Sequence, residues 1–278
     1  MIDMHLHSTW SDGSLNVSEL VYRLEENGVT HAVLTDHDCI LGYESFLNNC
    51  RGKGIITIPG VELEAYYDAD NSKYLHLLCY NYDDSERLNQ FLERERQLRI
   101  KAILDGIEKL KTKGINVTLE DVKNMSEGRH LLINHLCMLL EKKNVVKSRF
   151  DAFNMFLNED SYYHVDYPKY TVEEIISLIH KVGGTAVLAH PKRIPMNYDE
   201  KEKLVKYLKS IGLQGIEAYY ATDTPEERDF SLEMGYKYSL IETIGSDWHC
   251  DEDNISFGTS CYINPEHIKV LKRNFFHE

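Results

Sequence analysis

Short apolar runs alternate with amphipathic segments along most of the chain, and this alternation predicts its secondary structure. The apolar runs have the length and composition of strands; they span 1–6, 31–35, 55–58 (followed by 59–65), 74–80, 185–189, 215–219 and 240–246. The segments that carry apolar residues at helical spacing begin at 17, 43, 172, 198 and 225. This alternation predicts an α/β protein with a mainly parallel sheet covered by helices.

Two of the expected helices begin with a capping signal. Asn16 is followed by Glu19, and Thr171 is followed by Glu174, which is the spacing of a capping box. Gly28 is placed to end the first of these helices. We therefore expect one helix from 17 to just before Gly28 and another from 172 to 182.

The pattern changes between residues 84 and 167. Apolar residues recur there at helical spacing across a heavily charged stretch, and two or three shorter helical segments follow. Strand and helix alternate again from Thr171 onward. The sequence thus predicts a helical insertion at 84–167, which would cap the active site, within an α/β domain formed by 1–83 and 168–278.

Composition and charge restrict the function. The 278 residues, 42% hydrophobic and 27% charged, suffice for one large domain or one domain with an insertion. The formal net charge of −14 argues against a surface that binds long nucleic acid. No apolar run reaches about 18 residues and the chain begins with a strand, so we expect neither a membrane span nor export. Six cysteines without regular spacing favour reduced thiols and a cytoplasmic location.

Histidines and carboxylates lie within or just after the apolar runs. His5 and His7 are two residues apart in an expected strand, so they point to the same face. Asp247 and His249 repeat this spacing, and Trp248 is expected to face away. Two imidazoles on one face can share a cation.

Other residues of the same chemical types occupy corresponding places: His37, Glu62, His76 and His190. In parallel barrels, active sites gather at the rim formed by the carboxyl ends of the strands. Buried histidines and carboxylates at such a rim would repel one another or lack partners unless cations lay among them. Nitrogen and carboxylate ligands without thiolate suit zinc, manganese or iron.

Taken together, these residues resemble the polymerase and histidinol phosphatase (PHP) family. The resemblance runs from residue 2 to about 261 and rests on motifs in the family's order: His5-x-His7 with Ser11-Asp12-Gly13, Thr35-Asp36-His37-Asp38, Gly60-Val61-Glu62, Leu75-His76-Leu77-Leu78, Ala189-His190-Pro191 and Gly245-Ser246-Asp247-x-His249. It implies a distorted (β/α)7 barrel with a trinuclear metal centre. Glu62-x-Glu64 and the insertion are similar to the subgroup that acts on nucleotide phosphates, including 3′,5′-bisphosphonucleotide phosphatases and 5′ exonucleases of short RNA.

The resemblance also implies which residues hold three divalent ions, with manganese expected and iron or zinc as alternatives. The first ion would be held by His5, His7, Glu62 and Asp247. Glu62 would bridge to a second ion, completed by His76 and His190. The third ion would be held by Asp12, His37 and His249. Asp36 and Glu64 would orient ligating histidines.

The ions suggest a mechanism for phosphate ester hydrolysis. A metal lowers the pKa of bound water toward about 7, so a hydroxide that bridges the first two ions is expected to attack phosphorus in line. The third ion would neutralise phosphate charge in the transition state. Arg129 resembles an arginine that the family uses in a similar segment, although His130 follows it where relatives often have a proline before the histidine. Lys169 and Arg193 are further candidates for phosphate binding.

The predicted function is hydrolysis of phosphate monoesters of small nucleotides or of short 5′-phosphorylated RNA. A phosphatase of another metabolite, such as histidinol phosphate, is the closest alternative. A barrel hydrolase of C–N bonds also begins with H-x-H, but that class generally bridges its metals with a modified lysine, and Glu62 takes this place here. A non-catalytic module should have lost ligands, and none of the nine is missing.

Overall fold

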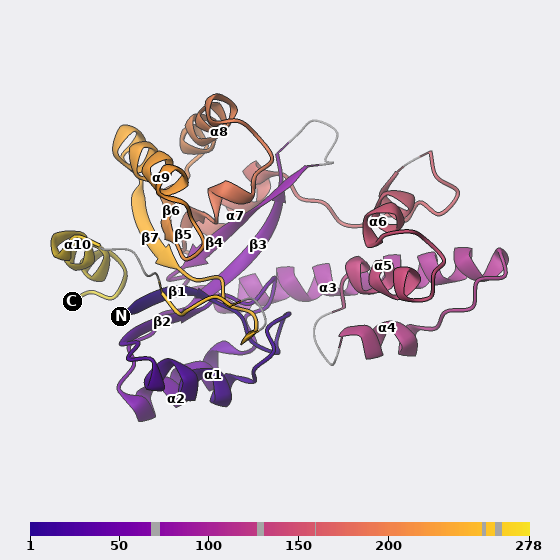
Figure 1. Ribbon diagram of the computed structural model, residues 1–278, viewed down its shortest axis with the longest axis horizontal. Coiled ribbons are helices and arrows are strands. Elements are labelled where there is room, and N and C mark those ends of the chain that lie inside the picture. Colours follow the sequence, from indigo (N-terminus) through magenta and orange to yellow (C-terminus); the bar gives the residue numbers. More distant parts are fainter. Residues whose placement is uncertain (68–72, 127–130, 159, 252–253, 259–262) are drawn as a thin grey trace. The chain divides into compact units, whose positions relative to one another are not determined.

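The computed structural model describes residues 1–67, 73–126, 131–158, 160–251, 254–258 and 263–278 (Figure 1). Within this part, the chain divides into two compact units. The first unit consists of Met1–Leu88 and Tyr170–Glu278, and the second consists of Asn89–Lys169. The second unit overlaps the predicted insertion at 84–167.

Two sheets form the centre of the first unit. Their strands in the described residues are β1 (Ile2–Leu6), β2 (His31–Leu34), β3 (Gly60–Tyr66), β4 (Tyr74–Tyr80), β5 (Thr185–Leu188), β6 (Gly215–Tyr220) and β7 (Ile241–Gly245). β1 and β2 form a parallel pair, and the second sheet has the order β3-β4-β5-β6-β7. In this second sheet β5, β6 and β7 are parallel, whereas β4 is antiparallel to both of its neighbours.

Isolated backbone bridges lie between the two sheets. Leu6 of β1 pairs with Trp248, which follows β7, and His37, which follows β2, pairs with Glu62 of β3. Both bridges are parallel. The predicted α/β class is confirmed. A closed (β/α)7 barrel is not shown, because the ladders of the described strands remain two separate sheets.

The β3-β4 hairpin interrupts the expected alternation of strand and helix. Residues 67–73 join the two strands. A parallel crossover needs about a dozen residues or more, so this connection permits only an antiparallel pair. The hairpin places Glu64 of β3 directly opposite His76 of β4.

The strand predicted at 55–58 is wrong. Ile56 makes one isolated bridge to His31, and the strand begins only at Gly60. Pro59 has no N–H group to donate to a ladder. At Gly60 a side chain would not fit, because a Cβ there would lie 2.4 Å from Val33 Cγ1.

The helices of the first unit match the predicted positions closely. They are α1 (Val17–Glu26), α2 (Tyr43–Lys53), α7 (Val172–Lys181), α8 (Tyr198–Ser210) and α9 (Pro225–Tyr238), with a 3-10 turn at Pro191–Arg193 and one helix that was not predicted, α10 (Pro265–Phe275). Both predicted capping boxes are confirmed, at Asn16 with Glu19 and at Thr171 with Glu174. Figure 1 shows α1 and α2 side by side next to β1 and β2.

One hydrophobic core joins both sheets to α10. It contains Ile2, Met4, Val33, Leu78, Tyr80, Val187, Ala218, Ile244, Leu271 and Phe275. The Tyr80 hydroxyl donates a hydrogen bond of 2.7 Å to Met4 O, and the Tyr80 ring packs edge-on against Phe275 of α10. A second cluster between β1, β2, α1 and α2 includes Trp248, which packs on Phe257.

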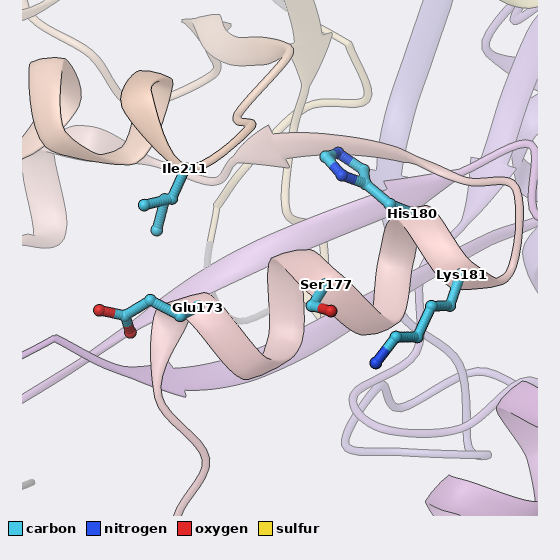
Figure 2. A pocket seen from close by; sticks show the side chains of 5 residues that line it. All are labelled: Glu173, Ser177, His180, Lys181 and Ile211. Carbon is cyan, nitrogen blue, oxygen red and sulfur yellow. The ribbon is translucent and has the colours of Figure 1, made fainter.

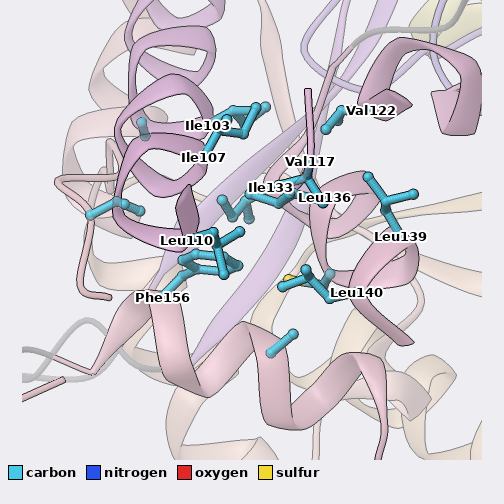
Figure 3. Close-up of a cluster of buried hydrophobic side chains, with 14 of the residues drawn as sticks. Ile103, Ile107, Leu110, Val117, Val122, Ile133, Leu136, Leu139, Leu140 and Phe156 are labelled. Carbon is cyan, nitrogen blue, oxygen red and sulfur yellow. The ribbon is translucent and has the colours of Figure 1, made fainter. Parts of the chain in front are cut away.

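The second unit is helical and has a core of its own. It contains most of α3 (Ser85–Thr112), with α4 (Leu119–Ser126), α5 (Ile133–Lys142) and α6 (Arg149–Leu157). Figure 3 shows side chains from all four helices meeting in this core, among them Ile107, Val122, Leu136 and Phe156. The helical character predicted for this stretch is confirmed.

Candidate metal centre

The strands place the predicted ligands in one cluster. His5 lies in β1 and His7 follows it, His37 follows β2, His190 follows β5, and Asp247 and His249 follow β7. Glu62 and His76 come from within β3 and β4. The carboxyl ends of parallel strands share an edge, which brings residues distant in sequence together. β4 runs antiparallel to its neighbours, so its beginning lies at this same edge, and its third residue, His76, joins the cluster.

Glu62 is fully buried at the centre of this cluster. Its Oε2 atom lies 3.0 Å from His5 Nε2, 3.2 Å from His7 Nε2 and 3.3 Å from His37 Nδ1. Its Oε1 atom lies 2.8 Å from both His76 Nδ1 and His190 Nε2. Five imidazoles thus converge on one carboxylate.

Hydrogen bonds alone do not account for this arrangement. An ionised carboxylate offers about four lone-pair positions, and five ring nitrogens lie within 3.3 Å of the Glu62 oxygens. Each donating imidazole would also have to present an N–H to the same small volume. Cations that share the nitrogen and oxygen lone pairs would resolve this crowding.

Asp12 organises the other side of the cluster. Its Oδ1 atom lies 3.3 Å from His249 Nε2 and 3.6 Å from His7 Nδ1, and its Oδ2 atom lies 3.7 Å from His37 Nε2. The rings of His7 and His249 stack with their centroids 4.0 Å apart. His7 therefore faces Asp12 with one nitrogen and Glu62 with the other.

Three groups of side chains in the described residues have ligand atoms close enough to share one ion. They are His5, His7, Glu62 and Asp247; His7, Asp12, His37 and His249; and His37, Glu62 and His76. The first group has the membership predicted for the first ion. The second adds His7 to the predicted third-ion set, and the third has His37 where the prediction has His190. The division of ligands among ions stays a prediction.

Burial and nearby charges shift the pKa values of residues in the cluster in different directions. Burial lowers the pKa of His5, but Glu62 and Glu217 outweigh this effect and raise it well above its ordinary value. Burial lowers the pKa of His37 to about 4 despite the nearby carboxylates of Glu62 and Asp12. Burial raises the pKa of Glu62, yet His37 and His5 lower it well below its usual range. A bound cation would take the place of the ring protons, because metal ligation requires neutral imidazole.

Two buried atoms provide a direct test of whether these residues fit a metal. Within the described part of the chain, His7 Nε2 and Asp247 Oδ1 are buried and have no hydrogen-bond partner. They lie 3.0 Å apart without hydrogen-bond geometry. Leaving buried polar atoms unpaired costs about 1–3 kcal/mol each. Their lone pairs converge where a divalent ion would sit, so the donor set fits a metal.

We expect metal removal to destabilise the first unit. Without ions, the buried atoms His7 Nε2 and Asp247 Oδ1 have no bonding partner. Manganese at 100 times its dissociation constant would add about 2.7 kcal/mol to the free energy of unfolding. Thermal unfolding followed by circular dichroism, in chelator and after manganese addition, measures this. A melting temperature that does not respond to manganese would contradict the metal assignment, and His5→Ala should weaken the response.

The three predicted phosphate-binding residues have different outcomes. The Arg193 guanidinium lies 2.8 Å from Asp247 Oδ2 and 5.5 Å from the centre of the Tyr220 ring, and its side chain is 48% exposed. It therefore stands beside the cluster. Lys169 belongs to the second unit, and Arg129 lies outside the described residues. Their roles, and the capping by 84–167, stay predictions.

The orienting roles predicted for Asp36 and Glu64 stay predictions, and the structure gives the surroundings of each residue. Asp36 accepts hydrogen bonds from the Ser8 N–H, at 2.8 Å, and from the Ser11 hydroxyl, at 2.6 Å. It therefore fixes the loop between His7 and Asp12 rather than binding a ring directly. Glu64 stands opposite His76 across the hairpin.

Sequence reasoning missed Glu217 of β6. It is fully buried and contacts both His5 and His190. The only signal in the sequence is a carboxylate inside the apolar strand Gly215–Tyr220, which is costly without a partner. Asp3 was missed for the same reason; it accepts hydrogen bonds from the backbone N–H groups of Ser246 and Gly258.

A surface hollow of about 540 Å³ lies elsewhere on the first unit (Figure 2). It is lined by Glu173, Ser177, His180, Lys181 and Ile211. His180 Nε2 lies 3.1 Å from Gly212 O, and Glu173 accepts a hydrogen bond from the Tyr207 hydroxyl. These polar groups serve the packing of α7 against the end of α8. None of the nine predicted ligands lines this hollow, so it is separate from the candidate metal centre.

The family model of the PHP domain matches residues 3–218. The chain belongs to the PHP domain family. This match confirms the resemblance found in the sequence. No helix in the described part of this PHP protein has the length and apolar character needed to cross a membrane.

Curated relatives of this PHP protein have the names of nucleases and phosphatases. It is 29% identical over 248 residues to a 5′-3′ exoribonuclease from Haemophilus influenzae, with 89% of each chain covered. It is 28% identical over 254 residues to the 5′-3′ exoribonuclease Rnm from Escherichia coli, covering 89% of this chain and 84% of the relative. It is 26% identical over 251 residues to a 3′,5′-nucleoside bisphosphate phosphatase from Chromobacterium violaceum, covering 89% and 87%. The PHP protein is accordingly a hydrolase of the phosphoesterase class.

Solved structures show the same fold. A candidate metal-dependent phosphoesterase from Bifidobacterium adolescentis has a TM-score of 0.74 at 24% identity, covering 98% of this chain and 95% of that chain. An amidohydrolase from Chromobacterium violaceum, solved with bound sulfate and no metal, has a TM-score of 0.76 at 23% identity, covering 95% and 92%. At these identities, the likeness establishes the fold of the PHP protein.

Proposed function

We propose that this PHP protein hydrolyses phosphate monoesters of small nucleotides, such as 3′,5′-bisphosphonucleotides or AMP, or the phosphodiester bonds of short 5′-phosphorylated RNA. The observation that carries the proposal is the convergence of five histidines on Glu62, with Asp247 and Asp12 on either side. Three divalent ions would be held by the nine predicted ligands, and manganese is the first ion to test.

The side chains of the cluster would have different roles in phosphate ester hydrolysis. When bound, divalent cations lower the pKa of water and offset the negative charge of the phosphoryl group. Glu62 would hold the histidines of two ion sites at fixed separation. Arg193, half exposed beside Asp247, offers a guanidinium that suits bidentate contact with phosphate oxygens. No covalent enzyme intermediate is required.

The choice of a small nucleotide substrate is supported by two observations. The relatives named above act, by their names, on RNA from its 5′ end or on nucleoside bisphosphates. The net charge of −14 disfavours long polyanions, because binding many phosphates requires many cationic side chains. A mononucleotide or a very short RNA presents few phosphates and is compatible with this charge.

Hydrolysis by manganese-loaded enzyme tests the proposal, measured as phosphate release from the monoesters and as mononucleotide release from the RNA substrate. The panel consists of a 3′,5′-bisphosphonucleotide, AMP, a 5′-phosphorylated dinucleotide and histidinol phosphate. We expect kcat/KM for the best nucleotide to exceed that for histidinol phosphate by at least about 100-fold, which corresponds to about 2.7 kcal/mol. Preference for histidinol phosphate would replace the nucleotide proposal with a metabolite phosphatase, and no hydrolysis of any member of the panel would overturn both.

Arg193→Ala is expected to raise KM for the preferred substrate roughly 10- to 100-fold, with a smaller change in kcat. A hydrogen bond to a charged group contributes about 1.5–3 kcal/mol, which gives this range. Arg193→Lys keeps the charge without the bidentate geometry and should be intermediate. Steady-state kinetics with measured manganese content checks the result. An unchanged KM combined with lower manganese content would mean that Arg193 acts through Asp247 instead.

A further inference from the structure

Glu217 is a buried carboxylate with two partners in the metal centre. It lies in the middle of β6 between the apolar residues Ile216 and Ala218, and its side chain is fully buried. Its Oε1 atom lies 3.0 Å from His5 Nδ1. Its Oε2 atom accepts a hydrogen bond of 2.7 Å from the backbone N–H of His190. A charge in such a position is costly unless both oxygens are used.

The contact with His5 determines which ring nitrogen faces the centre. A carboxylate only accepts hydrogen bonds, so the proton of a neutral His5 ring belongs on Nδ1. Nε2 then carries the free lone pair, and this atom lies 3.0 Å from Glu62 Oε2 and 3.3 Å from Asp247 Oδ1. Carboxylates that hold ligating histidines in this way fix the ring and make it a stronger ligand.

The contact with His190 fixes a backbone conformation. His190 has φ 27° and ψ 66°, a left-handed conformation that residues other than glycine adopt with strain. Its N–H is held by Glu217, and its Nε2 atom lies 2.8 Å from Glu62 Oε1. One side chain thus supports His5 through its ring and His190 through its main chain.

Gly245 of β7 leaves the space for this arrangement. A Cβ at this position would lie 2.3 Å from Glu217 Oε1 and 2.4 Å from His5 Cβ. Neither neighbour could move away without breaking the contact between them. The packing around Glu217 therefore requires a glycine at position 245 of the neighbouring strand β7.

Glu217 itself is placed to orient ligands rather than to bind an ion. Its two oxygens are engaged by His5 and His190. It is a member of none of the three ligand groups found in the described residues. One of those groups contains His5, whose Nε2 atom faces Glu62 and Asp247 while its Nδ1 atom contacts Glu217.

We propose that Glu217 is a positioning residue of the metal centre, which sets the tautomer of His5 and the main-chain conformation of His190 and thereby strengthens binding of the ions those residues hold. The third ion, expected at Asp12, His37 and His249, depends on it less, because Glu217 contacts His5 and His190 instead. This inference rests on the metal centre of the proposed function.

Manganese binding to Glu217→Gln tests the inference. Glutamine has nearly the same shape, but its single carbonyl oxygen cannot accept from both donors. We expect the dissociation constant for manganese, measured by isothermal titration calorimetry on metal-free full-length protein, to rise about 10- to 100-fold. Addition of His249→Ala should lower the bound manganese further, since the two changes affect different ligands.

Glu242→Gln is the matched control. Glu242 lies on the neighbouring strand β7, and its Oε2 atom is 3.2 Å from His267 Nδ1. The same substitution there removes a glutamate–histidine pair outside the cluster, so manganese affinity should stay at the wild-type value. Circular dichroism of the metal-free proteins establishes that each variant is folded, and Glu217→Asp, which keeps the charge and should bind manganese more tightly than Glu217→Gln, is the second variant if Glu217→Gln does not fold.

Wild-type affinity in Glu217→Gln, or an equal loss in Glu242→Gln, would overturn the positioning role. If Glu217→Gln does not fold, an affinity of Glu217→Asp equal to that of wild type would do the same. A wild-type protein that binds no manganese would instead overturn the proposed metal centre. His5→Ala separates the two failures, because it should weaken manganese binding whether or not Glu217 orients the ring.

Discussion

Glu62→Gln should abolish phosphoester hydrolysis, with kcat lowered by at least about 10³-fold. Glutamine fills the same volume, but it removes a negative charge and replaces one oxygen with a group that donates hydrogen bonds. Five imidazole nitrogens now face the Glu62 oxygens within 3.3 Å. An amide nitrogen there cannot ligate a cation and would repel any charged histidine, so manganese content should fall together with kcat.

The experiment combines steady-state phosphate release with elemental analysis of the purified protein. Glu242→Gln again provides the control, because it changes a glutamate of the same sheet that pairs with His267 rather than with the cluster. It should retain at least about half of the wild-type kcat, because neither Glu242 nor His267 is one of the predicted ligands. Full activity and full manganese content in Glu62→Gln would show that the cluster is not the active site.

His249→Ala should lower kcat by about 10²- to 10³-fold and leave the fold intact. The side chain of His249 is 18% exposed and stacks on His7, so its removal takes little from the hydrophobic core. Its Nε2 atom is 3.3 Å from Asp12 Oδ1. Loss of this nitrogen leaves Asp12, His37 and His7 to hold the third ion, and its occupancy should fall.

His267→Ala serves as the comparison for His249→Ala. His267 lies on α10 and pairs with Glu242, so the substitution removes an imidazole of similar exposure from a site without predicted chemistry. Phosphate release by both variants, at equal and saturating manganese, separates a catalytic loss from a general loss of histidine. Equal kcat values in His249→Ala and wild type would remove the third ion from the mechanism.

The sequence predicted secondary structure correctly where a local signal, such as a helix cap, and the packing of the segment favour the same element. The capping residues Asn16 and Thr171 predicted helix starts correctly, because the hydrogen bonds they make are local. The strand at 55–58 was wrong, since an apolar run of four residues contains no information about its ladder partners. The hairpin of β3 and β4 could have been expected from the short connection at 67–73. Helix α10 was not predicted.

Sequence patterns indicate the candidate ligands more readily than the residues that contact those ligands. In His5-x-His7 and Asp247-x-His249 the two residues are two apart, a spacing that puts side chains on one face of a strand. Asp247 and His249 follow β7 rather than lying in it, but the structure still brings these side chains into the cluster. Glu217 has no such spacing, and its contacts with His5 of β1 and with His190 after β5 become visible only in the folded structure. The pairing of His37 with both Asp12 and Glu62 likewise depends on distances that no linear pattern contains.

The separate core of the second unit affects how this protein can evolve. Ile107, Leu136 and Phe156 pack with one another, whereas every predicted metal ligand belongs to the first unit. Mutations can therefore accumulate in the helical unit, or replace it, without disturbing the residues proposed to break the ester bond. Selection for a new substrate and preservation of the chemistry can act on different stretches of the gene.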